Sequence, residues 1–90
     1  MKFLVKFGAA WCQPCVRLEP VLSKIVENFD AEVYEVDVDD IDPDILRDYG
    51  IVSVPVLLFM DDEGAEERIV GLPTPKVILE HLGIESSSLT

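Results

Sequence analysis

The sequence predicts a single α/β domain, in which helices flank a four-stranded mixed sheet and the elements follow the order βαβ-α-ββα. Two observations carry this prediction: a strand–helix–strand pattern fills the first 38 residues, and two further strands joined by a tight turn precede a last helix. Ninety residues, almost half of them hydrophobic, suffice for one folded domain. We expect this domain to span residues 1–84 and the polar residues 85–90 to form a disordered tail.

The first half of the chain has the pattern of a βαβ unit. Residues 1–8 are almost continuously apolar, which is typical of a strand buried on both faces. Residues 13–30 carry apolar side chains three or four positions apart, as an amphipathic helix does. Residues 32–38 alternate between apolar and polar, which indicates a second strand. A right-handed crossover would make the two strands parallel neighbours.

The second half begins with a short helix. Asp42 and Pro43 suit the N-cap and first turn of this helix, and Gly50 suits its end. The third strand is expected within residues 51–60, starting at Val54-Pro55.

A hairpin turn at residues 61–64 would lead to a fourth strand over residues 65–70. Its charged side chains suit an exposed antiparallel edge. Thr74 and Pro75 start a last helix that Gly83 ends. The apolar stripe of that helix is predicted to be Val77, Ile78, His81 and Leu82.

Two cysteines, Cys12 and Cys15, lie at the junction between the first strand and the first helix. A Cys-x-x-Cys pair at this place indicates redox chemistry more than metal binding. Cys12 falls where free backbone N–H groups favour a thiolate, so we expect an exposed thiol with a lowered pKa. Cys15 lies one turn inside the helix and is expected to be buried, with a higher pKa.

The segment Trp11-Cys12-Gln13-Pro14-Cys15 resembles the Trp-Cys-Gly-Pro-Cys signature of thioredoxins, with Gln13 in place of the glycine. Pro20 and the segment from Tyr49 to Pro55 extend the resemblance. It implies the thioredoxin fold, here without the strand and helix that usually precede its core. It further implies a cis Val54-Pro55 bond facing the cysteines and a substrate-binding surface formed by Trp11, Gln13, Pro14, Val54, Pro55 and Gly71.

The resemblance implies a thiol–disulfide oxidoreductase that reduces protein disulfides. Cys12 would attack the substrate disulfide, and Cys15 would then release the reduced substrate and leave a Cys12–Cys15 disulfide. The partners would be disulfide-containing proteins and an electron donor like thioredoxin reductase, with no cofactor. The spacer Gln13-Pro14 carries no positive charge, which favours a reductant over an oxidant.

The sequence departs from the thioredoxin pattern at Lys6 and Glu35. Thioredoxins usually have a buried aspartate at the first position and a lysine at the second, so the two charges are exchanged here. We expect Glu35 to pair with Lys6, because an unpaired buried lysine is costly. Both are candidate catalytic residues: Glu35 would take the proton of Cys15, directly or through water, while Lys6 keeps it ionised. In the rival interpretations Lys6 acts on Cys15 by its own charge, or reaches solvent and has no role.

Two other functions are open from the sequence. The chain has the size of a glutaredoxin, which would use glutathione, but it lacks the Cys-Pro-Tyr-Cys motif and the double glycine near Gly71. A metal-binding or interaction module could use the cysteine pair, but one pair supplies only two ligands and the lone His81 is distant in sequence. We therefore expect no metal site.

The net charge of −11 argues against nucleic acid or an anionic membrane as a partner. No apolar run approaches the roughly 20 residues that span a bilayer, and the short N-terminal one does not suit a signal peptide. Both cysteines belong to the motif, so the chain lacks the disulfide framework of secreted domains. We expect a monomeric, cytoplasmic protein.

Overall fold

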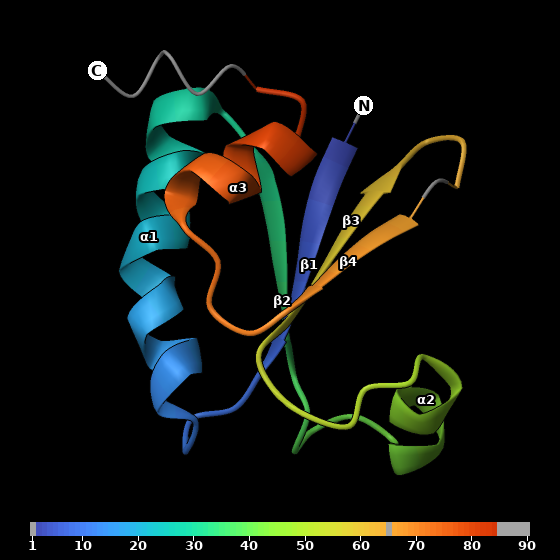
Figure 1. Ribbon diagram of the computed structural model, residues 1–90. Coiled ribbons are helices and arrows are strands. Elements are labelled where there is room, and N and C mark those ends of the chain that lie inside the picture. Colours follow the sequence, from blue (N-terminus) through green and yellow to red (C-terminus); the bar gives the residue numbers. More distant parts are fainter. Residues whose placement is uncertain (1, 65, 85–90) are drawn as a thin grey trace.

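A computed structural model describes residues 2–64 and 66–84 of the chain. The element order confirms the predicted βαβ-α-ββα arrangement (Figure 1). The tail expected at residues 85–90 lies outside the described residues. The elements are β1 (Lys2–Gly8), α1 (Gln13–Phe29), β2 (Glu32–Asp37), α2 (Pro43–Asp48), β3 (Val56–Asp61), β4 (Glu66–Val70) and α3 (Pro75–His81).

The four strands form one mixed sheet in the order β2-β1-β3-β4. The β1–β2 pair is parallel, as predicted, and its register places Lys6 opposite Glu35. The β1–β3 and β3–β4 pairs are antiparallel, and β4 lies at an edge of the sheet. Helices α1 and α3 lie on one side of the sheet, and α2 lies beyond one end of the strands (Figure 1).

The main core fills the space between the sheet, α1 and α3. Leu4 of β1, Leu18 of α1 and Leu57 of β3 are fully buried there. A smaller cluster lies on the opposite face, where Phe7 of β1 packs with residues that include Leu46 of α2. Burial on both faces of β1 is therefore confirmed near its C-terminal end, where the loops around α2 cover the second face.

The structure corrects two details of the predicted elements. Strand β3 begins at Val56, because Pro55 offers no backbone N–H for the ladder. In α3 the buried residues are Ile78 and Leu79, whereas Val77 and His81 are only half-buried. The helix is only seven residues long, and its buried face is rotated by about one position from the predicted stripe. Leu82, just after this helix, is buried as predicted.

The predicted helix starts are confirmed. The Asp42 side chain accepts a hydrogen bond from the Asp44 amide at 2.8 Å, and Thr74 caps α3 in the same way at 3.3 Å. Proline occupies the first turn of both helices. Among the described residues, none of the helices has the length and apolar character needed to cross a membrane.

Candidate redox site

The two cysteines form a disulfide at the junction of β1 and α1, with 5.2 Å between their Cα atoms. Strand β1 ends at Gly8, and the Cys12 amide donates to the Ala9 carbonyl at 3.1 Å in the turn that follows. Cys12 is the N-cap of α1 and Cys15 lies in its first turn. The predicted placement of the motif is thus confirmed.

The sulfur of Cys12 acts as the cap of α1. Its Sγ atom accepts a hydrogen bond from the Cys15 amide at 3.3 Å. The helix is seventeen residues long, and its N-terminus carries the positive end of the helix dipole. Free N–H groups and this dipole both stabilise a negative charge on Cys12 once the disulfide is reduced.

Exposure of Cys12 was predicted, and in the disulfide form this is wrong. Only 6% of Cys12 and 2% of Cys15 are accessible to solvent. Cys12 is covered because the bond to Cys15 joins its sulfur to the small cluster in which Ala9, Val38 and Val54 pack against the pair. Cys12 is still the more exposed of the two cysteines.

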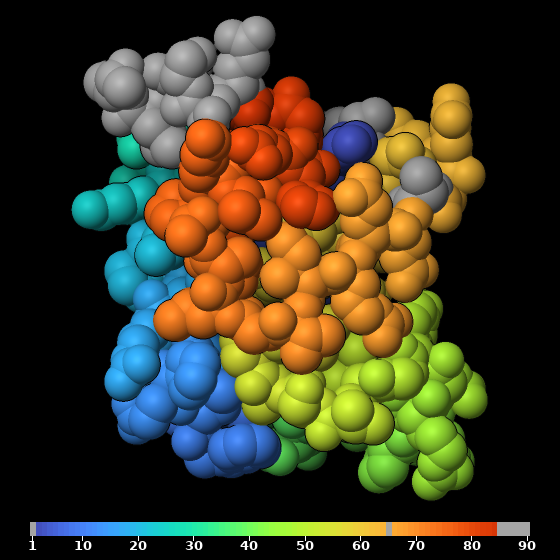
Figure 2. Space-filling model, in the orientation of Figure 1, coloured from blue at the N-terminus to red at the C-terminus, as the bar shows by residue number. Residues whose placement is uncertain are grey.

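Three segments distant in sequence meet beside the disulfide. The Val54-Pro55 bond is cis, as the resemblance implied, and the Val54 carbonyl oxygen lies 3.7 Å from Cys12 Sγ. The Gly71 amide donates to the Pro55 carbonyl at 3.0 Å. The space-filling view shows the segments before β3 and after β4 adjoining on the same face of the molecule (Figure 2). Gly71 has a φ of 106°, a value that favours glycine.

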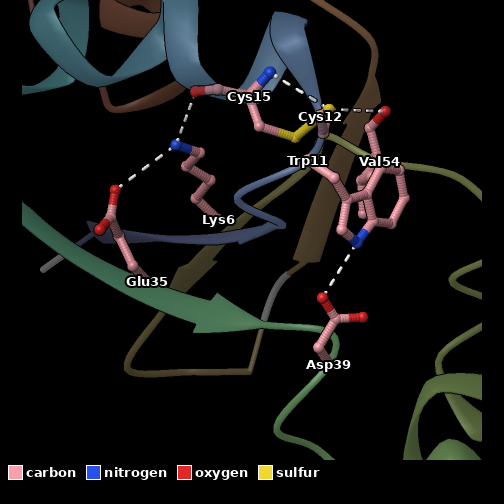
Figure 3. Close-up of a disulfide and its surroundings, with 7 residues drawn as sticks. All are labelled: Lys6, Trp11, Cys12, Cys15, Glu35, Asp39 and Val54. Atoms are coloured by element: carbon pink, nitrogen blue, oxygen red, sulfur yellow. Dashed lines mark hydrogen bonds and ion pairs between the residues drawn. A yellow bond between two sulfur atoms is a disulfide. The ribbon is translucent and has the colours of Figure 1, made fainter.

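Trp11 stands at the surface beside the pair, with 65% of the residue exposed. Its indole Nε1 donates a 2.9 Å hydrogen bond to Oδ2 of Asp39 (Figure 3). Asp39 was not among the predicted site residues. Because Trp11 follows β1, Asp39 follows β2 and the two strands are parallel, the carboxyl ends of these strands meet at one edge of the sheet. Gln13 and Pro14 are also exposed.

Lys6 is buried directly below Cys15, with only 4% of the residue exposed. Its Nζ donates to the Cys15 carbonyl oxygen at 2.9 Å and lies 3.5 Å from Oε1 of Glu35. The predicted pairing of Lys6 with Glu35 is confirmed, and the interpretation in which Lys6 reaches solvent is wrong. Lys6 lies between the Glu35 carboxylate and the sulfurs (Figure 3).

A cavity of about 170 Å³ opens beside Lys6 and Cys15. The charged residues that line it are Lys6 from β1, Glu19 from α1, and Glu35 and Asp37 from β2. Gly8 lines it too, and a Cβ atom at Gly8 would lie 3.3 Å from both Cys15 Sγ and Lys6 Cε. The absence of a side chain at Gly8 therefore lets the lysine chain and the sulfur approach each other. Sequence reasoning did not single out Gly8, Glu19 or Asp37.

A disulfide at the N-terminus of a helix, faced by a cis proline, defines this protein as a thiol–disulfide oxidoreductase. Within the described part of the chain, no group of three or more His, Cys, Asp or Glu side chains is placed to hold a metal ion.

Comparison with known proteins identifies the family. The thioredoxin family profile matches residues 1–83. Thioredoxin from Mycolicibacterium smegmatis is 37% identical over 82 residues, which cover 88% of this chain and 73% of that protein. A thioredoxin variant from Halobacterium salinarum has a solved structure with a TM-score of 0.80 and 34% identity, covering 90% of this chain and 71% of the other. Chloroplastic thioredoxin z gives a TM-score of 0.81 at 29% identity, covering 92% and 76%.

The chain therefore belongs to the thioredoxin family, and Cys12 and Cys15 are its redox pair. The fold and the protein-disulfide reductase function that the signature implied are confirmed.

Proposed function

We propose that this thioredoxin reduces disulfides in extended segments of other proteins, with Cys12 as the attacking sulfur. One observation supports Cys12 as the attacking sulfur: at the start of α1, Cys12 Sγ accepts a hydrogen bond from the Cys15 amide. The same geometry stabilises a thiolate on Cys12 more than on Cys15, which lies inside the first turn.

The reaction has two exchange steps. The Cys12 thiolate attacks one sulfur of the substrate disulfide, forms a mixed disulfide and releases the other substrate sulfur as a thiolate. Cys15 then loses its proton and attacks Cys12 Sγ. This step forms the Cys12–Cys15 disulfide and releases the second substrate sulfur. Two electrons have passed from the protein to the substrate.

The substrate would dock on the surface around Cys12. Trp11, Gln13 and Pro14 offer exposed side chains, and the half-buried Val54 brings its backbone to the same place. Pro55 and Gly71 bond to each other through their backbones and hold this side of the docking surface in position. An extended peptide can pair with backbone groups, as in strand addition. Such recognition depends little on the side chains of the substrate and would admit several proteins.

We propose that the Glu35 carboxylate accepts the proton that Cys15 loses, and that water carries the proton between the two side chains. The Glu35 carboxylate contacts Lys6, and both residues line the cavity that reaches Cys15. Direct transfer is disfavoured because Lys6 lies between the carboxylate and the sulfur (Figure 3). Water in the cavity could connect Cys15 with Glu35, whose carboxylate is held 3.5 Å from the ammonium group of Lys6.

The electron donor would be a reductase like thioredoxin reductase, and the protein would work as a cytoplasmic monomer without a cofactor. The motif supports this donor, because Gln13-Pro14 is closer to the thioredoxin spacer than to that of glutaredoxins.

Insulin reduction, driven either by a thioredoxin reductase with NADPH or by glutathione with glutathione reductase, tests the proposal. We expect turnover with the first donor, and Cys12→Ser should abolish it. Turnover with glutathione alone would instead favour glutaredoxin-like chemistry, and insulin left intact by both donors would contradict the proposed function.

A further inference from the structure

Lys6 supplies a positive charge below a redox pair whose spacer has none. Its Nζ is held at 2.9 Å by the Cys15 carbonyl, and its Cε and Cys15 Sγ converge on the space left open at Gly8. The ammonium group is fixed in position and almost completely removed from solvent.

We infer that the buried ammonium group of Lys6 stabilises the thiolate form of the reduced Cys12–Cys15 pair and so makes the disulfide more oxidising than its neutral spacer indicates. The inference rests on the proposed cycling of this pair. It revises the expectation of a plain reductant drawn from Gln13-Pro14, because the missing positive charge comes from β1 instead of the spacer.

Solvent screens the charges around Cys15 unequally. Three carboxylates, of Glu19, Glu35 and Asp37, also line the cavity and oppose the effect of Lys6. All three are exposed, Glu35 with 59% of its side chain accessible, so water and salt weaken their field at the sulfurs. Lys6 is 4% exposed, so its field is screened much less and dominates at Cys15.

The number of protons taken up on reduction shows at which pH the charge of Lys6 affects the equilibrium. The disulfide takes two electrons and two protons if both sulfurs end as thiols, but only one proton if one remains a thiolate. Two glutathione thiols supply these electrons and become one glutathione disulfide. Lys6 favours the product only when it contains a thiolate, so its effect must grow as the pH rises through the range where thiols ionise.

The measurement is the equilibrium between this protein and a glutathione buffer, read by alkylating the free thiols and counting the added mass. Lys6→Met removes the charge and keeps most of the side-chain volume. We expect it to lower the equilibrium constant for reduction by about tenfold near pH 8, which corresponds to about 30 mV. Near pH 5, below the ordinary thiol range, the two proteins should agree.

Two further variants separate charge from packing. Glu35→Gln removes the negative charge nearest to Lys6 but keeps a side-chain oxygen that can accept a hydrogen bond from the lysine. It should therefore shift the same equilibrium toward the reduced form. High salt should shrink this shift more than that of Lys6→Met. Lys24→Met makes the same charge change on the exposed surface of α1 and should leave the equilibrium unchanged.

An equilibrium constant within twofold of the wild type for folded Lys6→Met at pH 8 would overturn the inference. Shifts of the same sign in Lys6→Met and Glu35→Gln would also overturn it. The two variants remove opposite charges, so an effect of charge must give shifts of opposite sign. If Lys6→Met fails to fold, the Glu35→Gln variant still tests the inference, because a shift toward the oxidised form would overturn it. The proposed function fails separately, if the wild-type pair does not cycle or does not reduce insulin.

Discussion

The indole of Trp11 and the carboxylate of Asp39 join the ends of β1 and β2 by a 2.9 Å hydrogen bond. The bond orients a mostly exposed aromatic ring beside the disulfide (Figure 3). Since a freely rotating ring would lose conformational entropy on binding a substrate, a fixed ring makes binding more favourable.

Asp39→Ala tests this relationship. We expect the Michaelis constant for insulin to rise a few-fold, and the free energy of unfolding to fall by about 0.5–1.5 kcal/mol, the usual value of one hydrogen bond. Asp40→Ala removes the same charge from the neighbouring exposed position and is the control. Equal effects of the two variants would show that charge, and not the bond to Trp11, is responsible.

The cysteines should differ in reactivity after reduction. Cys12 caps α1 and is the less buried of the two, so iodoacetamide near neutral pH should modify it first. Cys15→Ser should accumulate a mixed disulfide with insulin, because the releasing sulfur is absent. Mass spectrometry of the alkylated protein checks the order, and faster labelling of Cys15 would reverse the assignment.

Tyr34 provides a test of pH dependence outside the site. Its hydroxyl donates to Oε2 of Glu32 at 3.1 Å. This hydrogen bond, the negative charge of Glu32 and a smaller effect of desolvation raise the pKa of the Tyr34 phenol above its ordinary value. The folded protein therefore holds this proton more tightly than the unfolded chain, and the associated stability is lost as the pH rises through the raised pKa.

Glu32→Gln should move the ionisation of Tyr34 to lower pH. Absorbance of the phenolate follows the titration, and Tyr34→Phe identifies the contribution of this residue. Glu63→Gln removes an equal charge from the turn between β3 and β4 and should leave the titration unchanged. A Tyr34 titration that is the same in Glu32→Gln and the wild type would contradict the assigned cause.

Sequence reasoning reached the element order and the redox pair because both depend on local signals. Strand alternation, helix caps and the Cys-x-x-Cys spacing are properties of short segments. The pairing of Lys6 with Glu35 also followed, since a buried charge on one strand needs a partner on its neighbour.

The features that were missed depend on how separate segments meet. Asp39 became part of the site through the register of β1 and β2, and Gly8 through the empty space below Cys15. The burial of Cys12 was missed because it depends on packing against Val38 and Val54, which belong to two other segments. Local patterns do not specify such contacts.

Glu35→Gln tests the proposed proton acceptor. The variant keeps the shape of the side chain but removes its basicity, so Cys15 should ionise more slowly in the mixed disulfide. We expect the release step to slow by about tenfold to a hundredfold, at or below the usual range for general base catalysis. A single-turnover experiment with a preformed mixed disulfide measures this rate across about pH 6 to 9, where thiols titrate.

The controls distinguish the carboxylate from its surroundings. Asp37→Asn removes another carboxylate from the same cavity and should leave the release rate near that of the wild type. The double variant Lys6→Asp/Glu35→Lys restores the usual thioredoxin arrangement, with the carboxylate on β1 below Cys15, and should recover fast release. If Glu35→Gln releases substrate at the wild-type rate across this pH range, Glu35 is not the base and Cys15 loses its proton to solvent beside Lys6.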